Sequence, residues 1–96
     1  MEQDFAHTTP ARITLVIVDD HPVFRQGLCN IFATEEDIEV LAEASSGEEA
    51  LLLVHDLRPD VLLLDINLPG INGLQVASRL KADQVSTAVV LLTAYD

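Results

Sequence analysis

Acidic side chains follow two of the apolar segments in this 96-residue chain. Asp19 and Asp20 come directly after the run ITLVIV, and Asp65 comes directly after the run VLLL. Such runs are typical of strands that are buried on both faces of a parallel sheet, and ligands bind beyond the carboxyl ends of those strands. Because neighbouring strands lie about 4.8 Å apart, we expect the three carboxylates to share one small pocket.

Three carboxylates at this spacing repel one another unless a cation lies between them or one of them takes up a proton. Hard divalent cations prefer oxygen ligands, and Mg²⁺ is usually held by one or two carboxylates together with waters and phosphate oxygens. The residues therefore predict a Mg²⁺ site formed by Asp19, Asp20 and Asp65. A single Asp after a strand is often only a turn former or a helix cap. Acidic residues at two strand ends favour a site.

A carboxylate is also a possible nucleophile toward phosphorus, and the product is an aspartyl-phosphate. Asp65 suits this role because it stands alone at the end of its strand, where a nearby metal ion would offset developing charge. Thr93 ends the last apolar run, TAVVLLT, so its hydroxyl is a candidate donor to a phosphoryl oxygen. The structural alternative for Thr93 is a β-branched residue that fills a strand end.

Apolar segments alternate with helical patterns along the chain, and this alternation predicts how the acidic residues are positioned. We expect strands over residues 13–18, 39–44, 61–64 and 87–93, and helices over residues 22–33, 46–57 and 74–81. The connections are short enough that only right-handed parallel crossovers fit. The order predicts a doubly wound α/β sheet.

Two local patterns support the helices. Ser46 and Glu49 have the S-x-x-E spacing of a capping box at the start of the second helix. Apolar side chains in the first helix recur at steps of three and four residues, which predicts an inward-facing stripe. The stripe comprises Phe24, Gly27, Leu28, Ile31 and Phe32.

The composition argues against several classes of protein. Five Lys and Arg against sixteen Asp and Glu give a net charge of -11, so we expect no direct binding of nucleic acid or of anionic membranes by this segment. The apolar runs are too short to cross a bilayer. Residues 1–11 are expected to form a disordered leader without signal-peptide features. With a single cysteine, the chain is expected to be cytoplasmic.

The segments that carry these features resemble the receiver domain of bacterial two-component response regulators. The acidic pair, a D-x-N-x-P-G-x-x-G loop and the strand-end Thr occur in the order typical of that family. The DDHP start and the DINLPGINGL loop resemble the NarL/LuxR-type subgroup, whose members usually carry a C-terminal helix-turn-helix output domain. The matching segments are LVIVDDHPVFRQGL, EASSGEEAL, RPDVLLLDINLPGINGL and VVLLTAYD.

The resemblance implies a flavodoxin-like sheet with strand order 2-1-3-4. It implies that Asp65 accepts a phosphoryl group from a histidine kinase, with Mg²⁺ held by Asp19, Asp20, Asp65 and the backbone carbonyl of Asn67. Thr93 matches the switch hydroxyl, which moves toward the phosphate in this family. The chain would then be a signalling phosphoacceptor, not a separate enzyme, and would act on a transcriptional output domain.

The sequence also departs from the family pattern. A complete receiver has a fifth strand ending in a Lys that pairs with the phosphate, and no residue of this chain matches that Lys. We therefore interpret residues 12–96 as a receiver domain that is incomplete at its C-terminus. The strand at 87–93 would then be an apolar edge of the sheet. Because such an edge can pair with another chain, we expect self-association as a homodimer, through this edge or through exchange of segments between chains. His21 is expected to be neither a metal ligand nor a phosphohistidine.

Two other functions compete with the leading prediction. A phosphatase or phosphotransferase with an aspartyl-phosphate intermediate typically has a second Asp two residues after the nucleophile, where this chain has Asn67. A degenerate receiver that serves as a protein-interaction or dimerisation scaffold is favoured by the missing Lys. The phosphoacceptor function agrees with more of the residues than either alternative.

Overall fold

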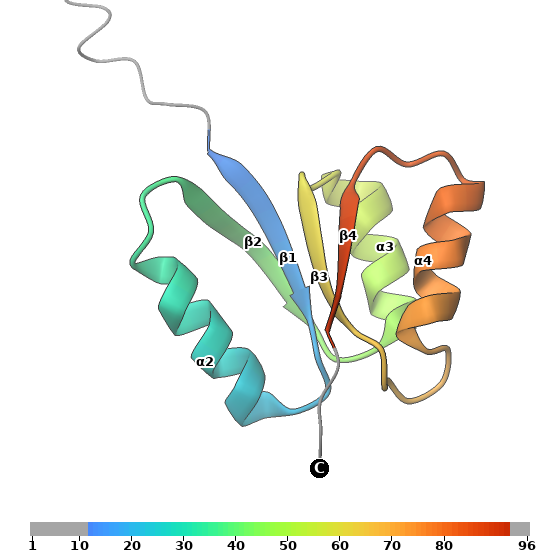
Figure 1. The fold of residues 1–96 in the computed structure, drawn as a ribbon, viewed down its shortest axis with the longest axis horizontal. Helices are drawn as coiled ribbons and strands as arrows, with labels where there is room; N and C mark the ends of the chain where they lie inside the picture. The colour runs from blue at the N-terminus through green and yellow to red at the C-terminus, as the bar shows by residue number, and fades with distance from the viewer. Residues whose placement is uncertain (1–11, 93–96) are drawn as a thin grey trace, which may run out of the picture.

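The structure, a computed structural model, describes residues 12–92, which form one parallel sheet flanked by helices (Figure 1). The strands lie in the order β2-β1-β3-β4, which confirms the flavodoxin-like, doubly wound prediction. Each described boundary falls within one residue of its expected position. The elements are β1 (Ile13–Val18), α2 (Pro22–Ala33), β2 (Ile38–Ala44), α3 (Gly47–Leu57), β3 (Val61–Asp65), α4 (Gly73–Ala82) and β4 (Ala88–Leu92). The leader expected at residues 1–11 lies outside the described residues.

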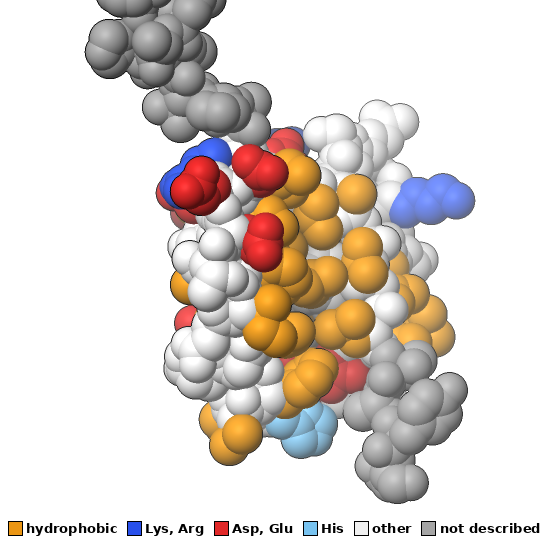
Figure 2. All heavy atoms as spheres, turned by 60° about the vertical axis from the view of Figure 1, so that its left-hand side comes forward, with side chains coloured by type: hydrophobic (Ala, Val, Ile, Leu, Met, Phe, Trp, Pro, Cys, Tyr) orange, Lys and Arg blue, Asp and Glu red, His pale blue; other side chains and the backbone are white. Residues whose placement is uncertain are grey.

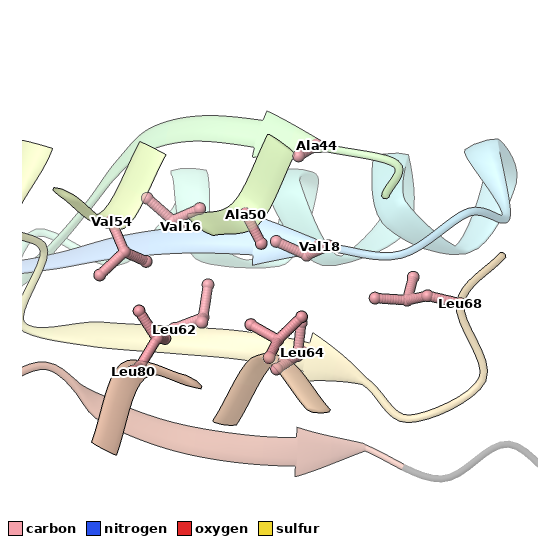
Figure 3. Close-up of a cluster of buried hydrophobic side chains, with 10 residues drawn as sticks. Val16, Val18, Ala44, Ala50, Val54, Leu62, Leu64, Leu68 and Leu80 are labelled. Atoms are coloured by element: carbon pink, nitrogen blue, oxygen red, sulfur yellow. The ribbon is translucent and has the colours of Figure 1, made fainter. Parts of the chain in front are cut away.

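The main core lies between the sheet and the two helices α3 and α4 (Figure 3). Strands β1 and β3 turn alternate side chains toward these helices, because successive side chains of a strand point to opposite faces. All of these side chains are buried, and they fix the two strands whose ends carry the acidic residues. The cluster comprises Val16, Val18, Ala44, Ala50, Val54, Leu62, Leu64, Leu68, Val76 and Leu80.

Helix α2 covers the opposite face of the sheet and packs against β1 and β2 (Figure 1). None of its residues is fully buried. The predicted stripe is wrong for Phe24 and Ile31, which are 49% and 61% exposed, and for Gly27, which is also exposed. The residues that turn toward the sheet are half-buried, and they are Arg25, Leu28, Cys29 and Phe32.

Arg25 gives a physical reason for this rotation of α2. Its guanidinium donates a hydrogen bond to the backbone carbonyl of Asp19 and another, of 3.1 Å, to the Glu43 carboxylate. These two contacts turn the side of α2 that carries Arg25 toward β1 and β2. Sequence periodicity weighs only apolar side chains and therefore could not anticipate a polar anchor.

The face beside α2 leaves part of the sheet uncovered. Ile17, Leu63 and Val90 are partners across β1, β3 and β4, and Ile17 is buried whereas Val90 is 44% exposed. Figure 2 shows hydrophobic side chains gathered on this side of the molecule. Within residues 12–92, β4 is also an edge of the sheet. Self-association through this edge stays a prediction.

The helices are short, with 12, 11 and 10 residues, and none within residues 12–92 is long and apolar enough to span a membrane. Ser46 caps α3 as expected, because its hydroxyl accepts the Glu49 N–H. The Glu49 carboxylate accepts the N–H of Ser45 instead of completing the box at Ser46. A full reciprocal capping box occurs at the start of α4, between Asn72 and Gln75.

Candidate functional site

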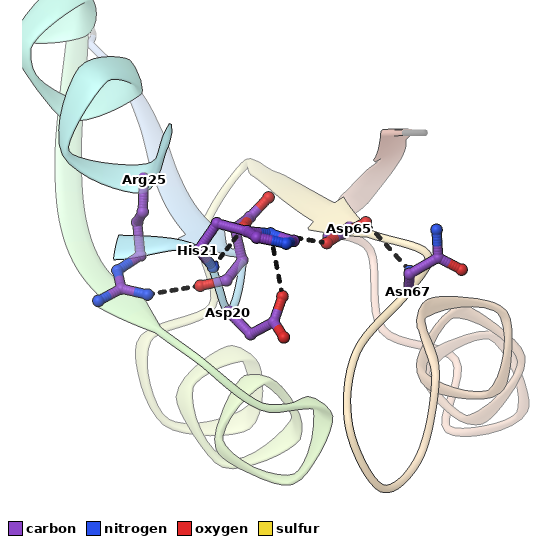
Figure 4. A network of polar contacts seen from close by, with 6 residues as sticks. Asp20, His21, Arg25, Asp65 and Asn67 are labelled. Carbon is purple, nitrogen blue, oxygen red and sulfur yellow. Dashed lines mark hydrogen bonds and ion pairs between the residues drawn. The ribbon is translucent and has the colours of Figure 1, made fainter. Parts of the chain in front are cut away.

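The three acidic side chains converge at the carboxyl ends of β1 and β3 (Figure 4). Val18 is the register partner of Leu64, so the residues that follow them emerge side by side. Asp19 and Asp65 are 3% and 1% exposed, whereas Asp20 is partly exposed. One carboxylate oxygen from each of these residues and one ring nitrogen of His21 all lie within 4.8 Å of one another. The predicted convergence is confirmed.

The two carboxylate oxygens of Asp65 have different surroundings. Oδ1 accepts a hydrogen bond of 3.0 Å from the backbone N–H of Asn67, whereas Oδ2 is buried and receives none. Burial raises the pKa of the Asp65 carboxyl; the Asn67 N–H opposes this rise, and the charges of Asp19 and Asp20 add to it. A buried oxygen without a partner is unfavourable unless a ligand satisfies it. The pocket therefore fits a hard cation with oxygen ligands.

His21 lies at the mouth of this pocket, which the sequence did not predict. Its Nδ1 is 2.8 Å from Asp19 Oδ1, 3.1 Å from Asp20 Oδ1 and 3.9 Å from Asp65 Oδ2. Its backbone N–H also donates to Asp19 Oδ1, at 2.7 Å. The hydrogen bond with Asp19 raises the pKa of the His21 imidazole, and the charges of Asp20 and Asp19 raise it further. The only sequence signal was that the histidine follows two aspartates.

The loop after Asp65 is fixed by close backbone packing. A Cβ on Gly73 would lie 2.5 Å from the Asp65 carbonyl oxygen and 2.8 Å from the Cα of Ile66. The Gly73 N–H donates to the Ile66 carbonyl at 2.9 Å. Gly70 adopts a φ of +73°, a conformation that favours glycine. Gly73 thus holds α4 close to the segment that carries Asp65, and both glycines belong to the D-x-N-x-P-G-x-x-G loop of the sequence.

The other predicted site residues stand as follows. Asn67 is exposed directly beside Asp65, and the proposed use of its backbone carbonyl by a metal stays a prediction. Thr93 lies outside the described residues, so its switch role also stays a prediction. Within the described part of β4, Leu92 is the register partner of Asp65, and its carbonyl accepts the Ile66 N–H at 3.0 Å.

Known proteins share this pattern of sequence. Residues 15–96 match the model of the response regulator receiver domain. The chain is 39% identical over 80 residues to the nitrate/nitrite response regulator protein NarL of Escherichia coli, and the aligned segment covers 83% of this chain and 37% of that protein. It is 38% identical over 87 residues to the probable transcriptional regulatory protein NarL of Mycobacterium tuberculosis, covering 91% of this chain and 40% of that one. The chain thus spans about two fifths of these relatives.

Solved structures share the fold. The signal receiver domain of the putative response regulator NarL from Mycobacterium tuberculosis superposes with a TM-score of 0.87 at 38% identity, covering 91% of this chain and 70% of that one. A DNA-binding response regulator of the LuxR family from Staphylococcus aureus gives a TM-score of 0.82 at 28% identity, covering 88% of this chain and 70% of that one. The likeness therefore extends from the motifs to the whole described sheet.

Proposed function

We propose that this chain, which belongs to the response regulator receiver domain family, accepts a phosphoryl group on Asp65. One observation carries the proposal: a carboxylate at a strand end is 1% exposed, and one of its oxygens has no hydrogen-bond partner. A carboxylate with a structural role would be expected to have its buried oxygens satisfied. Asp65 instead presents an unsatisfied oxygen to a pocket that contains two further carboxylates.

Transfer of a phosphoryl group to Asp65 requires mainly that its carboxylate is correctly oriented. A carboxylate oxygen of Asp65 forms a bond to phosphorus while the P–N bond of a phosphohistidine donor breaks, and the electron pair of that bond returns to the imidazole nitrogen of the donor. Asn67 holds Oδ1 through its N–H, which fixes the plane of the carboxylate. Positioning and charge stabilisation are the main contributions of a protein to phosphoryl transfer.

Mg²⁺ is the cofactor that fits the donor set. Asp19, Asp20, Asp65 and the backbone carbonyl of Asn67 would hold it, and when bound it supplies positive charge against the charge that develops on the phosphoryl oxygens. Arg25 does not take this part, because its guanidinium donates to the Asp19 carbonyl and to Glu43. It anchors the backbone of Asp19 instead.

The wider role that we propose is signalling. A histidine kinase would supply the phosphoryl group, Thr93 would act as the switch hydroxyl, and the response would reach a transcriptional output domain. The relatives that support this are named as response regulators and transcriptional regulatory proteins, and the chain spans only part of each of them. We propose residues 12–96 as the receiver unit.

The test is incubation with a small-molecule phosphodonor such as acetyl phosphate and Mg²⁺, followed by intact-mass measurement. We expect the unmodified chain to gain one phosphoryl group and Asp65→Asn to gain none. Asp60→Asn is the matched control, because Asp60 precedes the same strand at its opposite end, and it should still gain one group. A gain that persists in Asp65→Asn would contradict the proposal.

A scaffold without phosphoryl chemistry is the second candidate. It is favoured by the uncovered apolar face beside α2, where Val90 is 44% exposed, because such surface often marks an interaction site. If the unmodified chain gains no phosphoryl group while its fold is intact by circular dichroism, the scaffold function is the better supported of the two.

A further inference from the structure

Asp19 is the first residue after β1, and both polar groups of its backbone are tied to β2. Its N–H donates to the Ala44 carbonyl at 3.1 Å, and its carbonyl accepts a hydrogen bond from Arg25 Nη1 (Figure 4). The same guanidinium donates through Nε to the Glu43 carboxylate at 3.1 Å. Because Glu43 and Ala44 are neighbours on β2, Arg25 completes a clamp that holds the Asp19 backbone against that strand.

This clamp bears on Asp20 more than on the carboxylate of Asp19. Asp19 Oδ1 is already held, since it accepts the His21 N–H at 2.7 Å. Asp20 Oδ1 is buried and receives no hydrogen bond within residues 12–92; its charged contact is His21 Nδ1, at 3.1 Å. The direction of the Asp20 side chain therefore depends largely on its backbone. Because a peptide group is planar, fixing the Asp19 carbonyl also fixes the peptide that leads into Asp20.

The geometry of Arg25 suits it to this task. Its side chain is only 20% exposed, whereas that of Glu43 is 43% exposed. A guanidinium presents its N–H donors in one rigid plane, so two donors that bind two acceptors fix those acceptors relative to each other. A lysine ammonium on its flexible stem carries the same charge without this fixed geometry. The contact with Glu43 thus orients the guanidinium for the Asp19 carbonyl.

We propose that Arg25, oriented by Glu43, is a positioning residue for the acidic pair and favours binding of Mg²⁺ over the larger Ca²⁺. Mg²⁺ requires near-ideal octahedral geometry with bonds of about 2.1 Å, whereas Ca²⁺ accepts longer bonds and more flexible arrangements. An acidic pair on a fixed backbone meets the stricter requirement, and a loosened pair still suits Ca²⁺. The inference rests on the proposed function for the place of the ion, and it adds two residues that act through Asp19 and Asp20.

Calorimetric titration of the unmodified chain and of Arg25→Gln, with Mg²⁺ and with Ca²⁺, tests the proposal by the sign of the change. If Arg25 acted only through its positive charge, removing it from beside an acidic pocket would strengthen the binding of both ions. Loss of positioning predicts the opposite. We expect Mg²⁺ binding to weaken by roughly tenfold, as when a group that orients metal ligands is lost, and Ca²⁺ binding to weaken less. Unchanged or tighter Mg²⁺ binding, or an equal loss for both ions, would overturn the proposal.

Two further variants are controls. Arg58→Gln removes the same charge and also a hydrogen bond from Nε to a backbone carbonyl, that of His55 at 3.2 Å, but at the C-terminal end of α3. It should not weaken Mg²⁺ binding. Arg25→Lys keeps the charge and loses the planar donors, so its Mg²⁺ affinity should fall as in Arg25→Gln. Equal weakening in Arg58→Gln, or full Mg²⁺ binding by Arg25→Lys, would contradict the proposal.

Hydrogen exchange of the metal-free chain, followed by nuclear magnetic resonance, separates positioning from general stability. In Arg25→Gln we expect faster exchange at the Asp19 and His21 amides, whose hydrogen bonds lie in the clamped segment. Exchange at the amides of β3 should not change. Equal acceleration at all of these amides would show a general loss of stability and would overturn the proposal.

Asp65→Asn separates this inference from the proposed function. If Mg²⁺ binding depends on Asp65 and is unaffected by Arg25→Gln, the role of Arg25 fails and the phosphoacceptor proposal is untouched. If Mg²⁺ binds equally well without the Asp65 carboxylate, the ion lies outside the pocket, and the proposed metal site and this inference both fail.

Discussion

Asp60 and Asp65 stand at opposite ends of β3, and their surroundings are opposite as well. The exposed Asp60 accepts hydrogen bonds through Oδ2 from the Thr14 N–H at 2.9 Å and from the Thr14 hydroxyl at 3.0 Å. These bonds lower the pKa of the Asp60 carboxyl. Asp65 is buried with one oxygen unsatisfied, and its pKa is raised.

The difference separates a carboxylate with a structural role from the one that we propose as the phosphoacceptor. Asp60 joins β3 to β1 and has the partners that an ionised carboxylate needs. Asp65 is held in place by its surroundings, but only one of its two carboxylate oxygens has a hydrogen-bond partner among the described residues. Local rules of polar satisfaction are expected to be broken at functional sites and kept elsewhere. The neighbours of Asp65 should therefore matter for stability, whereas its charge should act against stability.

Removing the packing beneath Asp65 should have the largest effect on stability. Leu64 precedes Asp65 and is fully buried in the main core, so Leu64→Ala should lower the free energy of unfolding by about 3 kcal/mol. Leu63 is the matched control, since it lies on the other face and is only half-buried. Urea unfolding measures both variants. Equal decreases in the free energy of unfolding would contradict the expectation that the main core stabilises β3 more than the opposite face does.

Gly73→Ala should have the next largest effect. The added methyl would meet the Asp65 carbonyl at 2.5 Å, and such overpacking costs about 2 kcal/mol. Because the displaced backbone carries Asp65, phosphoryl acceptance should also fall. Gly27→Ala is the control: nothing lies within 4 Å of that position, and α2 should gain about 0.5 to 1 kcal/mol. Thermal unfolding and intact mass test the pair, and a neutral Gly73→Ala would contradict the close approach.

The two carboxylates should respond to pH with opposite signs. The folded pKa of Asp60 is lowered, so its contribution to stability is present above the unfolded pKa and is lost as pH falls through the folded pKa. The folded pKa of Asp65 is raised, so its contribution is present below the unfolded pKa and is lost as pH rises through the folded pKa.

Asp60→Asn should therefore lower the melting temperature at pH 7, and this deficit should shrink toward about pH 3. Asp65→Asn should raise the melting temperature at pH 7, with the gain shrinking over the same range. This is the smallest expected effect on stability, and thermal unfolding at several pH values measures it. A destabilised Asp65→Asn at pH 7 would mean that its charge is satisfied in the folded state.

The convergence of Asp19 and Asp65 could be predicted from the sequence because it depends on short-range signals. Apolar runs define β1 and β3, and parallel topology brings their carboxyl ends together. The contact between Thr14 and Asp60 spans an equal separation of 46 positions, but it could not be predicted, because its side chains are ordinary surface residues in the sequence.

The position of His21 and the rotation of α2 also escaped sequence analysis, for a related reason. The imidazole turns into the pocket because of the hydrogen bonds to Asp19, and α2 turns because Arg25 contacts Asp19 and Glu43. Both outcomes depend on polar partners that meet only in the folded chain. Periodicity describes apolar faces and contains no such information.

The pairing of β1 with β3 also bears on the order of folding. In the sequence, α2, β2 and α3 lie between these two paired strands. Contacts between residues so far apart form late, because closing a long loop costs conformational entropy. The repulsion between Asp19 and Asp65 is therefore absent from the early chain and is felt only near the native state. We expect Asp65→Asn to slow unfolding while leaving the folding rate nearly unchanged.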